Sequence, residues 1–540
     1  MAIVVACRCG KRYAVPDSLV GSEPKCPACG AKIPVVASPD CVDVEDWLLD
    51  GLSEKELTSI ADLTRSGAAM DSAPATRARL QWRCLLDWPT AAARYVVGTR
   101  LGRLGLAIAL LVIIPSIALT AWHWRGVNRL AAEKATIANS GEPISLRELS
   151  DAYRVAEGED DASQQWMGAV RSLAGPQYDP STTGLPIVDF AETDQAILIP
   201  PPPERWIELR KAEQLLHGFH NELAELKAVA GAEGEVRYPL EFETGSDANQ
   251  IHSLLMRGAR LLSLEAHVRA HQGASDGTAD SIHAVLALAA SLDDQPSLRA
   301  HRDMIDCSRM GCERIRQLLG HVEFSPQQLQ RLRDDLRAAD FQTSLYAALV
   351  GERVRGMAAL ESSSSLAASE TKATWVQSLG ASHEDTTFYL VCMNRAVRAA
   401  QEPLSEAIDV AWAIDEDLEN HVDNSAFGRR RFGGSLELVP LMYETFHDAA
   451  EAIALNRCAD AAIAAELYRQ QKGRLPQRLG ELTPDYFRTV PTDPRTEQPL
   501  YCGRSEEGFF VAGGRRDEEA DADEDAPALV FLVPGLATAP

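Results

Sequence analysis

Aromatic residues, cysteine and positive charge are all scarce in this chain of 540 residues. Phe, Trp and Tyr make up 6% of it, and 11 residues are cysteine. A secreted scaffold held together by disulfides needs a far higher share of cysteine. The 53 basic residues against 78 acidic ones give a net charge of −25, which argues against a chain that grips a polyphosphate along its length.

The sequence motifs of common enzymes are also missing. The chain has no G-x-S-x-G, no G-x-x-x-x-G-K, no G-x-G-x-x-G and no H-E-x-x-H, so it lacks the usual nucleophile, phosphate and zinc-protease signatures. Its length allows roughly three or four folded units. Its 46% of hydrophobic residues excludes wholesale disorder. We expect a mainly α, non-enzymatic protein without catalytic residues. A hydrolase site hidden in the helical region is the less favoured alternative.

One uncharged stretch divides the chain. Residues 104–124 contain no charged side chain, and a helix of this length reaches about 31 Å, the thickness of a hydrocarbon core. Trp122 and Trp124 end the stretch where an aromatic belt would lie, and a membrane helix tolerates Pro115. The alternative is the buried helix of a soluble protein, which seldom runs so far without a charge. We predict one transmembrane helix and a lipid bilayer as partner.

The charges on the two sides of this stretch predict its orientation. Residues 1–103 carry a net charge of +1 and residues 125–540 a net charge of −26. Arg77, Arg79 and Arg83 add basic residues on the N-terminal side, where the positive-inside rule places the cytoplasm. We expect a cytoplasmic N-terminus and an extracytoplasmic C-terminal region in the cell membrane.

Four cysteines at the N-terminus have the spacing of a zinc site. Cys7 and Cys9 are followed by Cys26 and Cys29, and two tight pairs of thiolates can converge on one tetrahedral Zn²⁺. A segment of this size has too small a core to fold without the metal. Two disulfides or free thiols are the alternative. We predict a zinc ribbon at residues 1–36, with a structural zinc that favours a reducing compartment.

The surroundings of this ribbon limit its partners. Five basic residues against two acidic ones between positions 8 and 32 give a local charge of +3, which could meet nucleic acid or an acidic protein, or simply keep the module soluble. Tyr13 is its one aromatic residue, so no stacking set for bases is present. We therefore expect no nucleic-acid partner. Residues 37–103 are predicted to be a cytoplasmic linker with a short helix at 43–59.

Helical patterns dominate the part of the chain after the membrane. Residues 125–204 are predicted to be a membrane-proximal helical and loop region, and residues 205–440 an irregular stack of helical hairpins. Helices are expected at 206–229, 251–271, 280–292 and 297–319, and another begins with Ser325 as N-cap and Pro326 at its first position. A loop is expected at 361–380.

Few side chains in the stack suggest chemistry. His267 and His271 have the i, i+4 spacing of metal ligands, but no third ligand is in register, so solvated or core-edge histidines are the favoured interpretation. His217 and His220 are interpreted in the same way. The five cysteines at 307, 312, 392, 458 and 502 form no tight pair, and we expect thiols in the core.

The last hundred residues carry an ordered motif string. An alanine-rich helix at 442–471 ends at Lys472-Gly473, and Gly473-Arg474-Leu475-Pro476, Val490-Pro491-Thr492-Asp493-Pro494 and Gly508-Phe509-Phe510-Val511 follow. This string resembles the globular part of type II secretion pseudopilins, which implies a long helix packed on a small antiparallel sheet over residues 441–540. Strands are expected near 499–502, 508–513 and 526–534. The pilin leader and methylated Phe are absent, so we expect packing or display instead of polymerisation.

The pseudopilin family carries a calcium loop near its end, and an acidic run lies at the matching place here. The alternating Asp521, Asp523 and Asp525 can present oxygens to Ca²⁺. A solvated loop of like charges is the alternative.

The whole chain is similar to a family of uncharacterised bacterial single-pass membrane proteins. The segments that carry the resemblance are 141–149 (GEPISLREL), 237–240 (RYPL) and 351–353 (GER). The resemblance implies architecture and location but no activity. Our leading hypothesis is an envelope scaffold that docks an unidentified protein, and one version of it is an accessory role beside a secretion machine. The alternative is a membrane-bound regulator whose ribbon contacts nucleic acid or a cytosolic partner.

Overall fold

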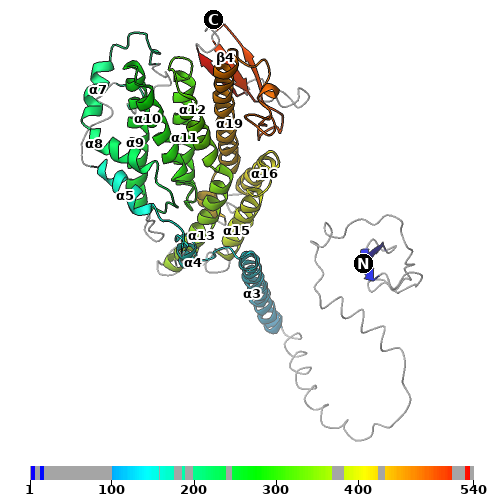
Figure 1. The fold of residues 1–540 in the computed structure, drawn as a ribbon. Coiled ribbons are helices and arrows are strands. Elements are labelled where there is room, and N and C mark those ends of the chain that lie inside the picture. The colour runs from blue at the N-terminus through cyan, green and yellow to red at the C-terminus, as the bar shows by residue number, and fades with distance from the viewer. Residues whose placement is uncertain are drawn as a thin grey trace. The chain divides into compact units, whose positions relative to one another are not determined.

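The computed structural model describes residues 2–6, 12–16, 100–156, 158–174, 185–188, 199–238, 246–367, 382–423, 432–506, 508–513 and 529–534. Within these ranges the chain is mainly helical, with one small three-stranded sheet near its C-terminus (Figure 1). Near the N-terminus, β1 (Ala2–Ala6) pairs antiparallel with β2 (Arg12–Pro16). The chain divides into two compact units, Met1–Ala109 and Leu110–Pro540.

The helix α3 (Arg100–Ser140) contains the predicted membrane segment. Its part Ala107–Ser140 is long and apolar enough to cross a bilayer, with a mean hydropathy of 1.8 in an 18-residue window of which 0% is buried. Leu111 and Ile117 are 75% and 63% exposed, whereas Ile137 on the same helix is 2% exposed. One end of α3 therefore leaves its apolar side chains uncovered, while the other end packs into the folded body.

Helices account for nearly all of the body. They are α4 (Leu146–Ala152), α5 (Ser163–Ser172), α7 (Leu209–His217), α8 (His220–Val229), α9 (Ser246–His271), α10 (Ser275–Ala290), α11 (Leu298–Leu318), α12 (Pro326–Ala338), α13 (Phe341–Ala367), α15 (Ser382–Ala399), α16 (Leu404–Asp423), α18 (Gly433–Leu438) and α19 (Met442–Lys472), followed by the short 3₁₀ helix η4 (Leu479–Leu482). Figure 1 shows α9, α10 and α11 side by side.

Three clusters of buried apolar side chains form the interior. The first lies among α5 and α7 to α11, the second among α11, α12, α19 and the C-terminal sheet, and the third among α13, α15, α16 and the start of α19. The helix α19 contributes to all three, because alanines along its buried face let several helices approach closely. Ile137 of α3 belongs to the third cluster, so the membrane-proximal helix is part of the body.

The C-terminal sheet has the strand order β3-β4-β5 and is antiparallel throughout. Its strands are β3 (Tyr501–Arg504), β4 (Gly508–Ala512) and β5 (Val530–Pro534). Phe509 and Phe531 are both 0% exposed and lie in the same cluster as Leu318 of α11 and Ile463 of α19. The sheet and the helical stack therefore share one core.

Several predicted helix ends are confirmed. Ser325 caps α12, accepting from the Gln328 backbone N–H while the Gln328 side chain accepts from the Ser325 N–H. The helix α19 ends at Gly473, whose φ of 72° suits glycine. Two predictions were wrong in detail. The expected helix at 206–229 is two helices, because the chain turns at Gly218 and Phe219. The expected loop at 361–380 begins later, since α13 continues to Ala367.

Candidate functional site

The predicted metal ligands lie outside the described residues. This holds for Cys7, Cys9, Cys26 and Cys29 of the zinc ribbon and for the acidic run around Asp523. The short hairpin of β1 and β2 is described, with Ala6 paired to Arg12. In the sequence, the first cysteine pair falls between these two strands.

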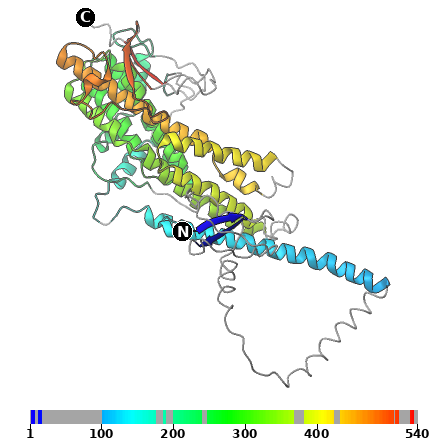
Figure 2. The same cartoon turned by 90° about the vertical axis from the view of Figure 1, so that its right-hand side faces the viewer.

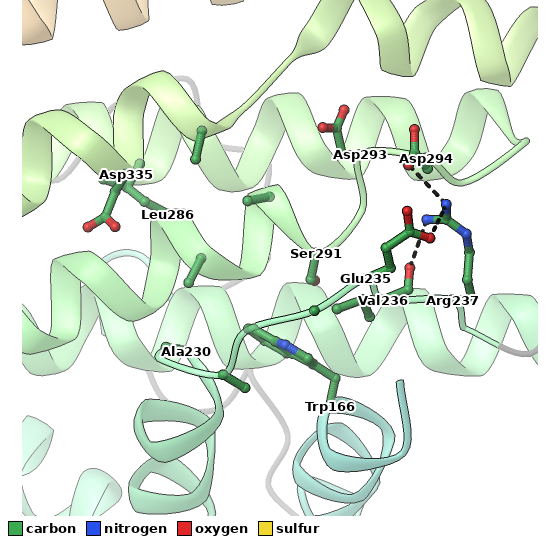
Figure 3. A pocket seen from close by; sticks show the side chains of 15 residues that line it. Trp166, Ala230, Glu235, Val236, Arg237, Leu286, Ser291, Asp293, Asp294 and Asp335 are labelled. Atoms are coloured by element: carbon green, nitrogen blue, oxygen red, sulfur yellow. Dashed lines mark hydrogen bonds and ion pairs between the residues drawn. The ribbon is translucent and has the colours of Figure 1, made fainter. Parts of the chain in front are cut away.

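The body contains a pocket that the sequence did not predict. It encloses about 300 Å³ and lies between α5, the segment after α8, the C-terminal part of α10 and α12. Figure 3 shows the Trp166 indole beside the chain segment that carries Val236. Leu286 and the alanines of α10 add apolar wall, whereas the remaining lining is strongly charged.

The segment after α8 is held in place by backbone contacts with the start of α5. The Glu235 N–H donates to Asp160 O at 2.8 Å, and the Ala162 N–H donates to Glu235 O at 3.0 Å. Gly234 makes this approach possible, because its φ is +118° and a Cβ there would lie 2.5 Å from Asp160 O. The pocket wall is therefore fixed by a close backbone pairing.

Arg237 is the one cationic side chain that lines the pocket, and it is already neutralised. Its Nη2 lies 2.7 Å from Glu235 Oε2 and 3.0 Å from Asp294 Oδ2. Its guanidinium also lies 5.6 Å from the centre of the Tyr153 ring, a cation–π contact. Figure 3 shows both ion pairs at one end of the pocket.

Two further carboxylates make the pocket acidic. Burial, and then the charges of Asp294 and Asp340, raise the pKa of Asp293 to about 7. Asp293 Oδ1 is buried without a hydrogen-bond partner among the described residues. Asp335 lies at the other end of the view in Figure 3, and its Oδ2 is 2.8 Å from His283 Nδ1.

The charges of the lining suit one kind of ligand. The pocket has more carboxylates than cations, so it suits a ligand with a positive group and an apolar part. Ser291 is its one hydroxyl side chain, and that hydroxyl donates to Leu288 O and contacts Tyr238 Oη. The residues that line the pocket include no histidine or cysteine, and its other titratable groups are carboxylates and Arg237.

A second group of potential ligands lies on α19. His447, Asp448 and Glu451 place one ligand atom each within 4.8 Å of one another. Arg309 Nη2, however, lies 2.8 Å from Glu451 Oε2 and 3.6 Å from Asp448 Oδ1. The guanidinium already supplies the cation that these carboxylates attract. Their i, i+1, i+4 spacing was the sequence signal for the group, and it was missed.

The histidines singled out by spacing do not converge. His271 Nε2 lies 2.9 Å from Pro200 O and the ring packs against Trp206 at 5.5 Å, whereas His267 is 0% exposed in the interior. His217 and His220 fall on different helices. The predicted core thiols are confirmed: all five cysteines in the described part are free, and four of them are buried. Burial raises the pKa of Cys502 to about 11, so even this half-buried thiol is unreactive near neutral pH.

Comparisons of the chain with models of protein families, with curated proteins and with solved structures found no match.

Proposed function

We propose that the chain is a non-enzymatic, single-pass membrane protein whose helical body docks a protein partner outside the cytoplasm. The uncovered apolar part of α3 supports the membrane anchor. The charge difference between residues 1–103 and 125–540 supports a cytoplasmic N-terminus. The long helix α19 and the antiparallel sheet of β3, β4 and β5 support the pseudopilin-like module that we propose for residues 441–540.

The observation that carries docking is an exposed aromatic pair on α16 and α19. Trp412 is 60% exposed and stands edge-on to Tyr443 with 5.4 Å between ring centres. Leu441, two residues before Tyr443, is 62% exposed. Exposed Trp and Tyr side chains are the residues most often found at the centre of protein interfaces.

Acidic residues surround this pair. Asp409, Glu416 and Glu419 are exposed on α16, three residues before and four and seven residues after Trp412, so they share its side of the helix. Figures 1 and 2 show α16 at the side of the body, next to α15. The chemistry predicts a partner with an apolar pocket for the indole and a basic rim.

Photocrosslinking in intact membranes tests this docking surface. Benzoylphenylalanine in place of Trp412 should give a discrete adduct, and the same probe in place of Tyr501 on β3 should not. Glu416→Lys should weaken the adduct at position 412 several-fold, because it repels a basic rim. Equal labelling at both positions, or none at 412, contradicts the proposal.

We propose that Cys7, Cys9, Cys26 and Cys29 hold one structural Zn²⁺ in the cytoplasm. The support is the spacing of the thiolates and the hairpin that brackets the first pair. Full-length protein should contain one zinc per chain. Cys26→Ser should lose it, whereas the control Cys41→Ser in the linker should retain it, and identical zinc contents in the two variants contradict the assignment.

A second candidate function is a regulator that senses a small organic cation, and the acidic pocket favours it. Primary amines should raise the unfolding temperature of the full-length protein more than their neutral alcohol analogues. Asp294→Asn should reduce that difference, because it removes a carboxylate from the pocket. A response that is equal for amines and alcohols contradicts this candidate.

A further inference from the structure

Arg314 of α11 is a buried guanidinium that forms no direct ion pair with the described residues, although the Glu313 charge acts on it. It is 6% exposed, and its Nε and Nη1 have no hydrogen-bond partner among the described residues. The comparable buried arginines are paired: Arg333 lies 2.5 Å from Asp460 and Arg353 lies 2.7 Å from Glu142. An unpaired charge in the interior costs several kcal/mol, so Arg314 needs an explanation that Arg333 and Arg353 do not.

The neighbours of Arg314 follow from the register of two helices. His252 Nδ1 lies 2.7 Å from Asp303 Oδ2, and Cys307 Sγ lies 3.7 Å from Met256 Sδ. Both contacts join α9 to α11 and have the same offset of 51 residues along the sequence, so the two helices run parallel. The same offset places Ser263 opposite Arg314.

Two polar side chains of α9 follow this register and are 0% exposed. Ser263 Oγ is buried without a hydrogen bond among the described residues, and the His267 ring has the Gln317 side chain as a hydrogen-bond partner. Burial and then the charge of Arg314 hold the pKa of His267 well below its ordinary value. His267 is therefore a neutral donor beside the guanidinium and supplies no competing positive charge.

The nearest carboxylates are used elsewhere. Glu313 accepts from Arg316 Nε at 2.6 Å and also from Gln317. Glu265 of α9 accepts from Lys227 at 2.8 Å and from Ser281 at 3.1 Å. The register of the two helices and the effect of the Arg314 charge on His267 instead place the Ser263 hydroxyl and the His267 ring near the guanidinium.

We propose that Arg314, Ser263 and His267 hold a small monovalent anion, of the size and charge of chloride, between α9 and α11. A single negative charge matches the single guanidinium, and the unpartnered Nη1 can donate to it. The hydroxyl and one imidazole N–H complete the shell. A water molecule would satisfy the hydrogen bonds but would leave the charge uncompensated, and a metal cation would be repelled by Arg314.

Anion-dependent unfolding of the full-length protein in detergent tests this site. At constant ionic strength, replacing sodium gluconate by sodium chloride should raise the unfolding temperature saturably, by about 2 °C at chloride concentrations well above the dissociation constant. Arg314→Met should abolish the response. The control Arg309→Met removes a half-exposed arginine of the same helix that pairs with Glu451, and it should leave the response intact.

A second measurement does not depend on how the variant folds. Wild-type protein should broaden the ³⁵Cl resonance of dilute chloride, and bromide should compete for the same site. Absence of broadening, or a chloride response that Arg314→Met leaves unchanged, means that water alone fills the position and overturns the proposal.

Discussion

The guanidinium of Arg353 lies 2.7 Å from the carboxylate of Glu142 in the interior of the protein. Glu142 lies two residues after the end of α3, and its other oxygen accepts from Tyr346 Oη at 3.0 Å. Arg353 is on α13, and its side chain is 3% exposed. The chain that leaves the proposed membrane helix is thus fixed to the body by a buried ion pair as well as by Ile137.

Breaking this pair should be costly. Arg353→Met should lower the free energy of unfolding by about 3–5 kcal/mol, because it leaves the largely buried Glu142 carboxylate without its counter-charge. Adding Glu142→Gln should restore part of the loss. Denaturant unfolding of the full-length protein gives the values. Arg355→Met is the control: its half-exposed pair with Glu352 should cost about 1 kcal/mol. Equal losses at positions 353 and 355 refute a buried pair.

Two helical glycines should respond to alanine with opposite signs. A Cβ on Gly351 would lie 2.0 Å from the carbonyl oxygen of Pro296, which is backbone and cannot rotate away. Gly351→Ala should therefore lower the free energy of unfolding by about 2–3 kcal/mol. A Cβ on Gly168 of α5 would meet nothing within 4 Å, so Gly168→Ala should raise stability by about 0.5–1 kcal/mol through helix propensity. Thermal unfolding distinguishes the two, and a stabilising Gly351→Ala would contradict the contact between α13 and the loop before α11.

The acidic pocket predicts a pH dependence of stability. The Asp293 pKa is raised from 3.8 to about 7 in the folded protein, so folding favours the protonated carboxyl. The stabilisation that the protonated Asp293 carboxyl gives the folded protein is complete below pH 3.8 and is lost as the pH rises towards 7. Relative to Asp293→Asn, the wild type should lose about 1–2 kcal/mol between pH 4 and pH 8, after allowance for solvent screening.

The measurement is the difference in unfolding free energy between wild type and Asp293→Asn as a function of pH. Asp334→Asn on the exposed side of α12 is the control for removal of a carboxylate. Asp294→Asn should move the wild-type transition to lower pH, because it removes a like charge. A flat difference for Asp293→Asn would show that its carboxyl is solvated.

Local patterns predicted most of the helices but not what they bury. Ser325, Pro326 and Gly473 act within one turn of the chain, so their positions alone predicted helix ends. The break at Gly218 was missed because the apolar spacing of residues 206–229 continues through it. The spacing of apolar residues also does not predict which helices pack against one another when they are far apart in the sequence.

The pocket and the buried arginine illustrate that limit. Trp166, Arg237, Asp293 and Asp335 belong to four separate segments, and their meeting depends on how α5, α10 and α12 pack. Likewise, Arg314 and Ser263 lie on α11 and α9, which contact each other and α10 only in the folded body. The adjacent Asp293 and Asp294 after an apolar helix were a visible signal, but nothing local identified which of the two would be buried.

Protease protection tests the central claim, that α3 separates an N-terminal head from an extracytoplasmic helical body. One epitope is placed at the N-terminus and a second after Ser140. Proteinase K added to intact spheroplasts should remove the second epitope and leave the first on a protected fragment of about 100–125 residues, which would end within or just after the apolar span. Both epitopes should disappear once the membrane is permeabilised. Loss of both epitopes in intact spheroplasts, or protection of both, would place head and body on the same side and contradict the account.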